Sequence, residues 1–148
     1  MPNHLNILLG NTHVAPYDET ASASILSAFN AAVLGQLLTI DTNFDAKPGL
    51  IQEWNFDFKE MKYTLTLAPD VYFHNGRKAD SKDLEFALLR GFFTKHNSFY
   101  SIFLGNILGV EEIREGMKFK TGLVKGIRII NERSIEVRLK EPNPAFLF

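Results

Sequence analysis

The chain of 148 residues has no cysteine, no long hydrophobic run and no basic cluster longer than Arg77-Lys78. Without cysteine it forms no disulfide, no thiolate zinc site and no cysteine nucleophile, although many exported proteins also lack disulfides. No apolar run approaches the ~20 residues that span a bilayer, and Leu5 to Leu9 is too short for the core of a signal peptide. The formal net charge of −1 argues against nucleic acid or an anionic membrane surface as a partner.

Sequence motifs of catalysis and phosphate binding are absent as well. There is no G-x-S-x-G elbow and no G-x-x-x-x-G-K loop. The charged run Glu111, Glu112, Arg114 and Glu115 is interpreted as a solvated helix face, because nothing indicates a desolvated pocket around it. Histidines with no partner at i+4 are predicted to be exposed loop residues rather than metal ligands; they are His4, His13, His74 and His96. The sequence therefore predicts no enzyme, no metal site and no cofactor.

The chain does have the apolar content for one core, with 45% hydrophobic residues and thirteen phenylalanines. Its most informative stretch begins with Lys62 to Leu67, whose alternation predicts a half-buried strand. Ala68 to Asp70 breaks this strand, Val71 to Phe73 is predicted as a second short strand, and His74-Asn75-Gly76 as a tight turn.

A helix is predicted to follow this turn. Asp80 is placed to cap its first N–H groups, and Asp83 adds negative charge to the first turn. We expect the helix to run from Ser81 to about Thr94. Its expected apolar face consists of Leu84, Phe86, Leu88, Leu89, Phe92 and Phe93.

The sequence LTLAPDVYFHNGRKADSKDLEFAL resembles the signature segment of the family 5 extracellular solute-binding proteins, which are peptide-binding and nickel-binding receptors of ABC transporters. That segment runs approximately F-x-L-R-x-G-V-x-F-H-D-G-x-P-x-T-A-x-D-V-x-F-S, and the spacing agrees without a gap from Leu67 to Phe86. Three positions depart from it, with Ala68 for the usual arginine, Asp70 for glycine and Lys78 for proline.

The chain before this segment is predicted to contain a strand at Leu5 to Leu9 and a helix from Thr20 or Ser22 to about Leu34, where Gly35 would end the helix in the left-handed conformation. Leu37 to Ile40 is predicted as a short strand and Asp41 to Asp45 as a polar turn. Pro48 to Trp54 resembles the family's P-x-L-A-x-S-W, and Trp54 is interpreted as a core anchor rather than a ligand contact.

The chain after the segment is predicted to form a helix from Ile107 to Glu115, with Gly116 as its stop. This helix resembles the I-x-G-x-x-E-x-x-x-G helix of the oligopeptide-binding branch. Val124 to Ile130 and Ser134 to Leu139 are predicted to form a hairpin. The end of that hairpin matches the family's V-x-L-x-x-P-x-P-x-F at Val137, Leu139, Pro142, Pro144 and Phe146.

The resemblance implies a mixed α/β fold of the type II periplasmic-binding-protein kind. Residues 1–148 would be an N-terminal fragment of lobe one, with about 1–40 giving a strand and helix of that lobe and 41–148 its small subdomain and the start of the return. The second lobe would be absent. The apolar end Ala145 to Phe148 is interpreted as unpaired, which favours a fragment.

The implied function is capture of a peptide between two lobes and its delivery to a membrane permease. The implied location is the periplasm or the outside of the cell, next to the membrane through the transporter. A signal peptide is not in this chain. Thr20, Ala21 and Ser22 would contact the ligand main chain, and Tyr100, or Phe99 with a one-residue gap, would line the cavity. The same residues could instead be an N-cap loop and core aromatics. The alternative function is a stand-alone interaction domain that dimerises through its apolar C-terminus and Phe99 to Leu104.

Overall fold

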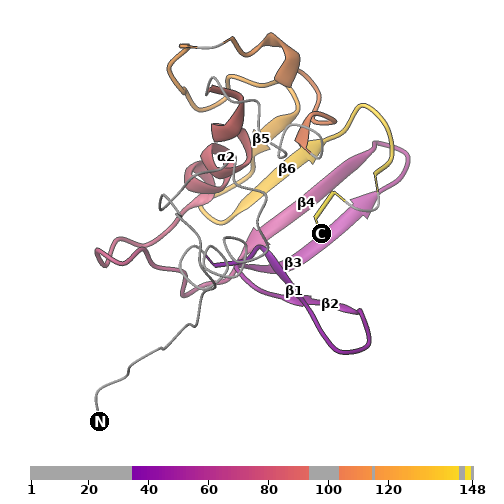
Figure 1. Ribbon diagram of the computed structural model, residues 1–148, viewed down its shortest axis with the longest axis vertical. Helices are drawn as coiled ribbons and strands as arrows, with labels where there is room; N and C mark the ends of the chain where they lie inside the picture. The colour runs from indigo at the N-terminus through magenta and orange to yellow at the C-terminus, as the bar shows by residue number, and fades with distance from the viewer. Residues whose placement is uncertain (1–34, 94–103, 115, 144–145, 148) are drawn as a thin grey trace, which may run out of the picture.

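The structure, a computed structural model, describes residues 35–93, 104–114, 116–143 and 146–147 (Figure 1). Strands β1 and β2 form a two-stranded sheet, and β3 to β6 form a four-stranded antiparallel sheet in the order β3-β4-β6-β5. The strands are β1 Leu38–Ile40, β2 Ala46–Pro48, β3 Ile51–Asp57, β4 Lys62–Leu67, β5 Ile127–Ile129 and β6 Ser134–Arg138. The helices are α2 Ser81–Leu89 and the 3-10 helices η1 Arg90–Phe93 and η2 Val110–Glu112.

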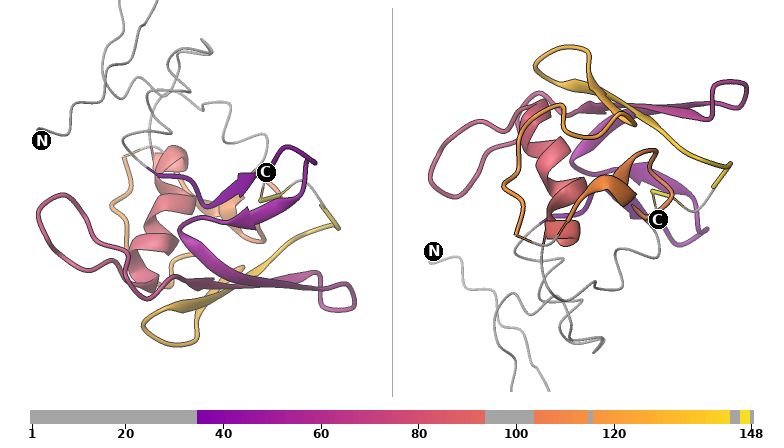
Figure 2. Two further views of the ribbon diagram at one scale, coloured as in Figure 1. Left: turned by 90° about the horizontal axis from the view of Figure 1, so that it is seen from below. Right: turned by 90° about the horizontal axis from the view of Figure 1, so that it is seen from above.

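One face of the four-stranded sheet is dry and the other is polar. Along β4, Tyr63, Leu65 and Leu67 are buried, as their alternation predicts. Helix α2 contacts β5 and β6 on this dry face (Figure 2) and brings Leu84, Leu88 and Leu89 into the same core. On the opposite face, Glu136 of β6 pairs with a lysine of β4 and an arginine of β5. The predicted hairpin of one wet and one dry face is therefore confirmed.

The turn between β1 and β2 is built by one aspartate. The side chain of Asp41 accepts hydrogen bonds from the backbone N–H groups of Asn43, at 2.8 Å, and Asp45, at 3.0 Å. This closes the polar turn that the sequence predicts at Asp41 to Asp45. The sequence did not indicate β2, because Ala-Lys-Pro has no strand pattern. These residues pair with β1 in the register that the turn imposes.

Two predicted elements are wrong. Val71 to Phe73 is not a strand, since only Tyr72 forms a single bridge, with Lys78. The helix predicted from Ile107 to Glu115 is reduced to η2, because Gly109 adopts φ 90° and Ile107 pairs in extended conformation with Leu139 of the neighbouring chain segment. The side chains predicted to share one side of that helix are nevertheless buried; they are Ile107, Val110 and Ile113.

The predicted helix from Ser81 to Thr94 is confirmed in its first part only. It stays α-helical to Leu89 and continues as 3-10 helix to Phe93, while Thr94 lies outside the described residues. Phe86, expected on the apolar face, keeps 45% of its surface exposed. Its place in the core is taken by Glu85, which is fully buried.

Phe146 and Leu147, the described residues of the C-terminal segment, are not unpaired, contrary to the sequence-based expectation. Phe146 and Leu147 are both buried, and the ring of Phe146 stacks on that of Tyr63 with centroids 5.4 Å apart. The tyrosine hydroxyl donates to the carbonyl of Asn143 at 3.3 Å. The wrong inference came from judging the segment by its composition, whereas a tyrosine some eighty positions earlier supplies its partner.

Candidate functional site

The signature segment, residues 67–86, forms a projecting loop that returns to α2. The loop is closed by backbone hydrogen bonds from Phe73 N–H to the carbonyl of Arg77 and from Ala79 N–H to that of Val71, both 2.9 Å. Gly76 takes φ 82° at the tip, which confirms the predicted turn at His74-Asn75-Gly76. The loop therefore has a fixed shape without being a strand pair.

An arginine ties this loop to the helix. The guanidinium of Arg77 donates to both carboxylate oxygens of Asp83, at 2.8 and 2.7 Å, and lies 4.4 Å from the centre of the Phe73 ring. This bidentate pair lowers the pKa of Asp83 and raises that of Arg77. Phe73 is 44% and Tyr72 56% exposed at the surface of the loop.

The start of α2 is a reciprocal cap. The Asp80 side chain accepts from the N–H groups of Lys82 and Asp83, and the Asp83 side chain accepts from the N–H of Asp80 at 2.9 Å. The predicted cap is thus confirmed, and Asp83 has a second task besides supplying charge. In this segment Asp80 and Asp83 therefore fix the start of α2 and its link to the loop.

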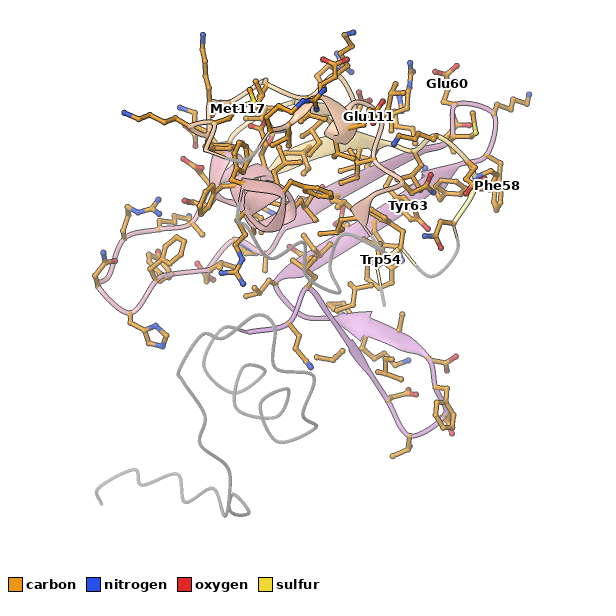
Figure 3. The ribbon with its side chains drawn as sticks, turned by 45° about the horizontal axis from the view of Figure 1, so that its top comes forward. Trp54, Phe58, Glu60, Tyr63, Glu111 and Met117 are labelled. Carbon is orange, nitrogen blue, oxygen red and sulfur yellow. The ribbon has the colours of Figure 1, made fainter. Side chains whose placement is uncertain are left out.

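A row of aromatic rings crosses the sheet from an exposed turn to the C-terminal segment. Phe58, 73% exposed, packs edge-on against Phe56 at 4.7 Å, and Phe56 lies 4.5 Å from Tyr63. Figure 3 shows Phe58 at the β3–β4 turn and Trp54 further along β3. Trp54 is half-buried and packs against the core, which agrees with its interpretation as an anchor.

Glu85 is the only buried carboxyl group in the described part of the chain. Its Oε1 accepts a hydrogen bond from the N–H of Gly122 at 2.8 Å, while Oε2 accepts none from the described part of the chain. Burial raises the pKa of this carboxyl, against the opposing effect of the glycine N–H. Sequence analysis missed this residue, although its spacing from Leu88 and Leu89 by three and four positions was a signal for a core-facing side chain.

The described residues hold no cluster of three or more metal-ligating side chains, and none of their helices has the length and hydrophobicity to cross a bilayer. Glu111 and Glu112 are exposed and pair with Lys140 and Lys125, as expected for a solvated face. His74 is exposed, as predicted, and His4, His13 and His96 lie outside the described residues.

The predicted ligand contacts fall in the segments that flank the described body. Thr20, Ala21, Ser22, Phe99 and Tyr100 all lie outside the described residues, as do the predicted first strand and first helix. The described body begins directly after the first of these segments, where Gly35 adopts the expected left-handed φ of 74°. In the sequence, the first segment precedes β1, and the second lies between η1 and η2.

The chain is similar to a known protein family and to characterised proteins. The family described as bacterial extracellular solute-binding proteins, family 5 Middle, matches residues 45–148. The periplasmic oligopeptide-binding protein OppA of Escherichia coli K12 is 33% identical over 113 residues, which is 74% of this chain and 20% of OppA.

Solved structures share the fold. The substrate-binding domain of an oligopeptide ABC transporter from Bacillus anthracis superposes with a TM-score of 0.71 and 24% identity, over 87% of this chain and 24% of that one. NikZ from Campylobacter jejuni, solved with Ni(L-His), gives a TM-score of 0.66 and 23% identity, over 92% of this chain and 24% of that one. This chain therefore spans about a fifth to a quarter of the length of the relatives it matches.

Proposed function

The chain belongs to the bacterial extracellular solute-binding proteins of family 5, and we propose that it is the N-terminal part of a receptor that captures peptides between two lobes and delivers them to a membrane permease. The observation that carries this proposal is the family match over residues 45–148, within which Asp83 binds Arg77 and Asp80 caps α2. The division into residues 1–40 as lobe-one strand and helix and 41–148 as small subdomain is part of the proposal.

The receptor performs no chemistry. Binding in this scheme needs concave surface, backbone hydrogen-bond groups and aromatic walls rather than a reactive side chain. The one buried carboxyl of the described part, Glu85, is enclosed between helix α2 and the loop that contains Gly122. Its environment therefore supports a structural role rather than general acid catalysis.

The ligand is proposed to be a peptide held through its main chain. The loop residues Thr20, Ala21 and Ser22 would offer backbone groups in strand fashion, which accepts many side chains. Tyr100, with Phe99 as the alternate, would form an aromatic wall. A peptide is favoured over a nickel complex because OppA, the relative that is 33% identical, is an oligopeptide-binding protein by name, whereas the nickel-bound NikZ is only 23% identical.

Transport follows from closure of two lobes around the peptide. The second lobe would supply the opposite wall of the cavity, so the 148-residue chain alone is expected to bind peptide weakly or not at all. The receptor would act in the periplasm or outside the cell, held near the membrane by its permease. Stimulation of the reconstituted transporter by the full-length receptor and peptide would test the permease partnership.

Calorimetry on the full-length protein tests the ligand and its contacts. Truncation of Tyr100 to alanine should weaken binding of a short peptide about tenfold, since an aromatic wall contributes on the order of 1.4 kcal/mol. Tyr72→Ala is the matched control, because Tyr72 is an exposed tyrosine on the signature loop. Micromolar peptide binding by the 148-residue chain alone, or equal affinities of the two variants, would contradict the proposal.

The competing hypothesis is a stand-alone domain that dimerises through its apolar C-terminus and Phe99 to Leu104, and the burial of two C-terminal residues counts against it. Phe146 and Leu147 are buried within the chain and are not offered to a second copy. Sedimentation velocity on the 148-residue chain should accordingly show a monomer. Self-association that disappears on removal of residues 144–148 would favour the competing hypothesis.

A further inference from the structure

The contact between helix α2 and the loop of residues 116–124, here named the 116–124 loop, depends on a single buried carboxyl. Glu85 projects from α2 with no exposed surface. The N–H of Gly122 donates to its Oε1 at 2.8 Å, and no described residue donates to Oε2. One backbone donor is too little compensation for a carboxylate removed from water.

Aromatic rings complete the contact around this hydrogen bond. Phe119 of the loop packs against Phe86 of α2, with centroids 5.0 Å apart, and against Phe93 of η1, at 6.1 Å. All three rings retain solvent exposure at the surface of the contact. Gly122 itself adopts φ 76° and a Cβ built there would meet nothing within 4 Å, so the loop is open to solvent on that side. Glu85 and Phe119 therefore hold the loop against α2, while Leu123 and Val124 anchor its C-terminal end in the core.

Among the described residues, no charged side chain donates a hydrogen bond to Glu85. The charged side chains on the described elements around it are Lys82, Asp83, Arg90, Lys118, Lys120, Arg128, Glu136 and Arg138. None of them donates to Oε2. Asp83 forms its ion pair with Arg77, and the two lysines of the loop are exposed. The charged residues of β5 and β6 lie on the polar face of the sheet, away from α2.

We propose that Glu85 is a pH-sensitive latch, which in its neutral form holds the 116–124 loop against α2 and on ionisation releases it. The neutral carboxyl keeps its acceptor for Gly122 and is tolerated in the apolar contact. The carboxylate gains more from water than from one N–H, so its ionisation favours a state in which the side chain is hydrated and the Phe119 contact is opened.

The sign of the pH dependence follows from burial. Because burial raises the pKa of Glu85 above its ordinary value of 4.5, the closed loop is most stable below that value. Its stability then falls as the pH rises through the folded-state pKa. The protection of the Gly122 amide against hydrogen exchange should decrease by about tenfold for each pH unit that separates the two pKa values.

NMR of the 148-residue chain, labelled with ¹³C at the glutamate carboxyls, tests the latch between pH 4 and pH 8. We expect the Glu85 carboxyl signal to titrate above its ordinary range, with the Gly122 amide protection factor falling over the same interval. In Glu85→Gln, which keeps the acceptor but cannot ionise, that protection factor should not depend on pH. Glu53→Gln, at an exposed position of β3, is the matched control and should behave like the wild type.

Glu85→Leu is a second test of the latch, and its result does not depend on how the buried site accommodates the glutamine side chain. It removes the acceptor, so protection at Gly122 should be lower than in the wild type at acidic pH and independent of pH. The latch is refuted if Glu85 titrates near its ordinary value, or if Glu85→Gln keeps the pH dependence of the wild type.

Discussion

Gly126 lies where two chain segments meet β6 with almost no space between them. Its substitution by alanine is expected to destabilise the fold strongly. Its N–H donates to the carbonyl of Leu108 at 2.8 Å, and its carbonyl accepts from the N–H of Arg138 at 2.7 Å. A Cβ placed on Gly126 would lie 2.5 Å from the carbonyl oxygen of Leu108 and 2.8 Å from its nitrogen. Both neighbours are backbone atoms, so no side chain can rotate away.

The expected loss in free energy of unfolding follows from the backbone hydrogen bonds that the added methyl group would disturb. Separating the two segments weakens up to three backbone hydrogen bonds, the third being from Leu108 N–H to the carbonyl of Arg138 at 3.0 Å. At about 1 kcal/mol net for each bond, Gly126→Ala should lower the free energy of unfolding by about 2 to 4 kcal/mol. The expected loss is a substantial part of the stability of a domain of this size.

Urea denaturation followed by circular dichroism measures this loss. Gly76→Ala is the control, because Gly76 has φ 82° but open space around its Cβ, so only the left-handed backbone penalty of about 1 kcal/mol applies. A Gly126→Ala variant within about 0.5 kcal/mol of the wild type would refute the steric argument.

Two further substitutions test the local structure. Asp80→Ala removes the acceptor for two N–H groups of α2 and should lower the free energy of unfolding by about 1 kcal/mol, measured in urea; an unchanged midpoint would contradict the capping role. Glu136 pairs with Lys62 at 2.9 Å and with Arg128 at 2.6 Å, contacts that lower its pKa. The stability from this carboxylate is present above its ordinary pKa of 4.5 and is lost as the pH falls through the folded-state pKa. The stability difference between wild type and Glu136→Gln should therefore be constant near neutral pH and shrink toward pH 3, and a difference independent of pH would count against the ion pairs.

Local chemistry accounts for the parts of the fold that the sequence predicted correctly. The alternation in β4, the turn at Asn75-Gly76 and the cap at Asp80 each depend on residues within a few positions of one another. The same holds for the polar turn that Asp41 closes. The family resemblance rested on this local segment, and the match over residues 45–148 confirms it.

The candidate ligand site was predicted only through the resemblance. Thr20, Ala21, Ser22, Phe99 and Tyr100 have no pattern of spacing that marks a binding site, and a cavity wall is defined by what faces it from another part of a protein. Their roles therefore stay predictions for the binding experiments on the full-length protein.

The sequence by itself determined the elements whose signals are short-range, namely the strand at β4, the turn before α2 and the start of that helix. Only the tertiary structure decided which residues lie inside. It buried Glu85 against Gly122, paired Ile107 with Leu139 in place of a helix, and covered Phe146 with Tyr63. Each of these outcomes joins positions more than thirty residues apart, where the free energy of the contact exceeds the local preference of either residue.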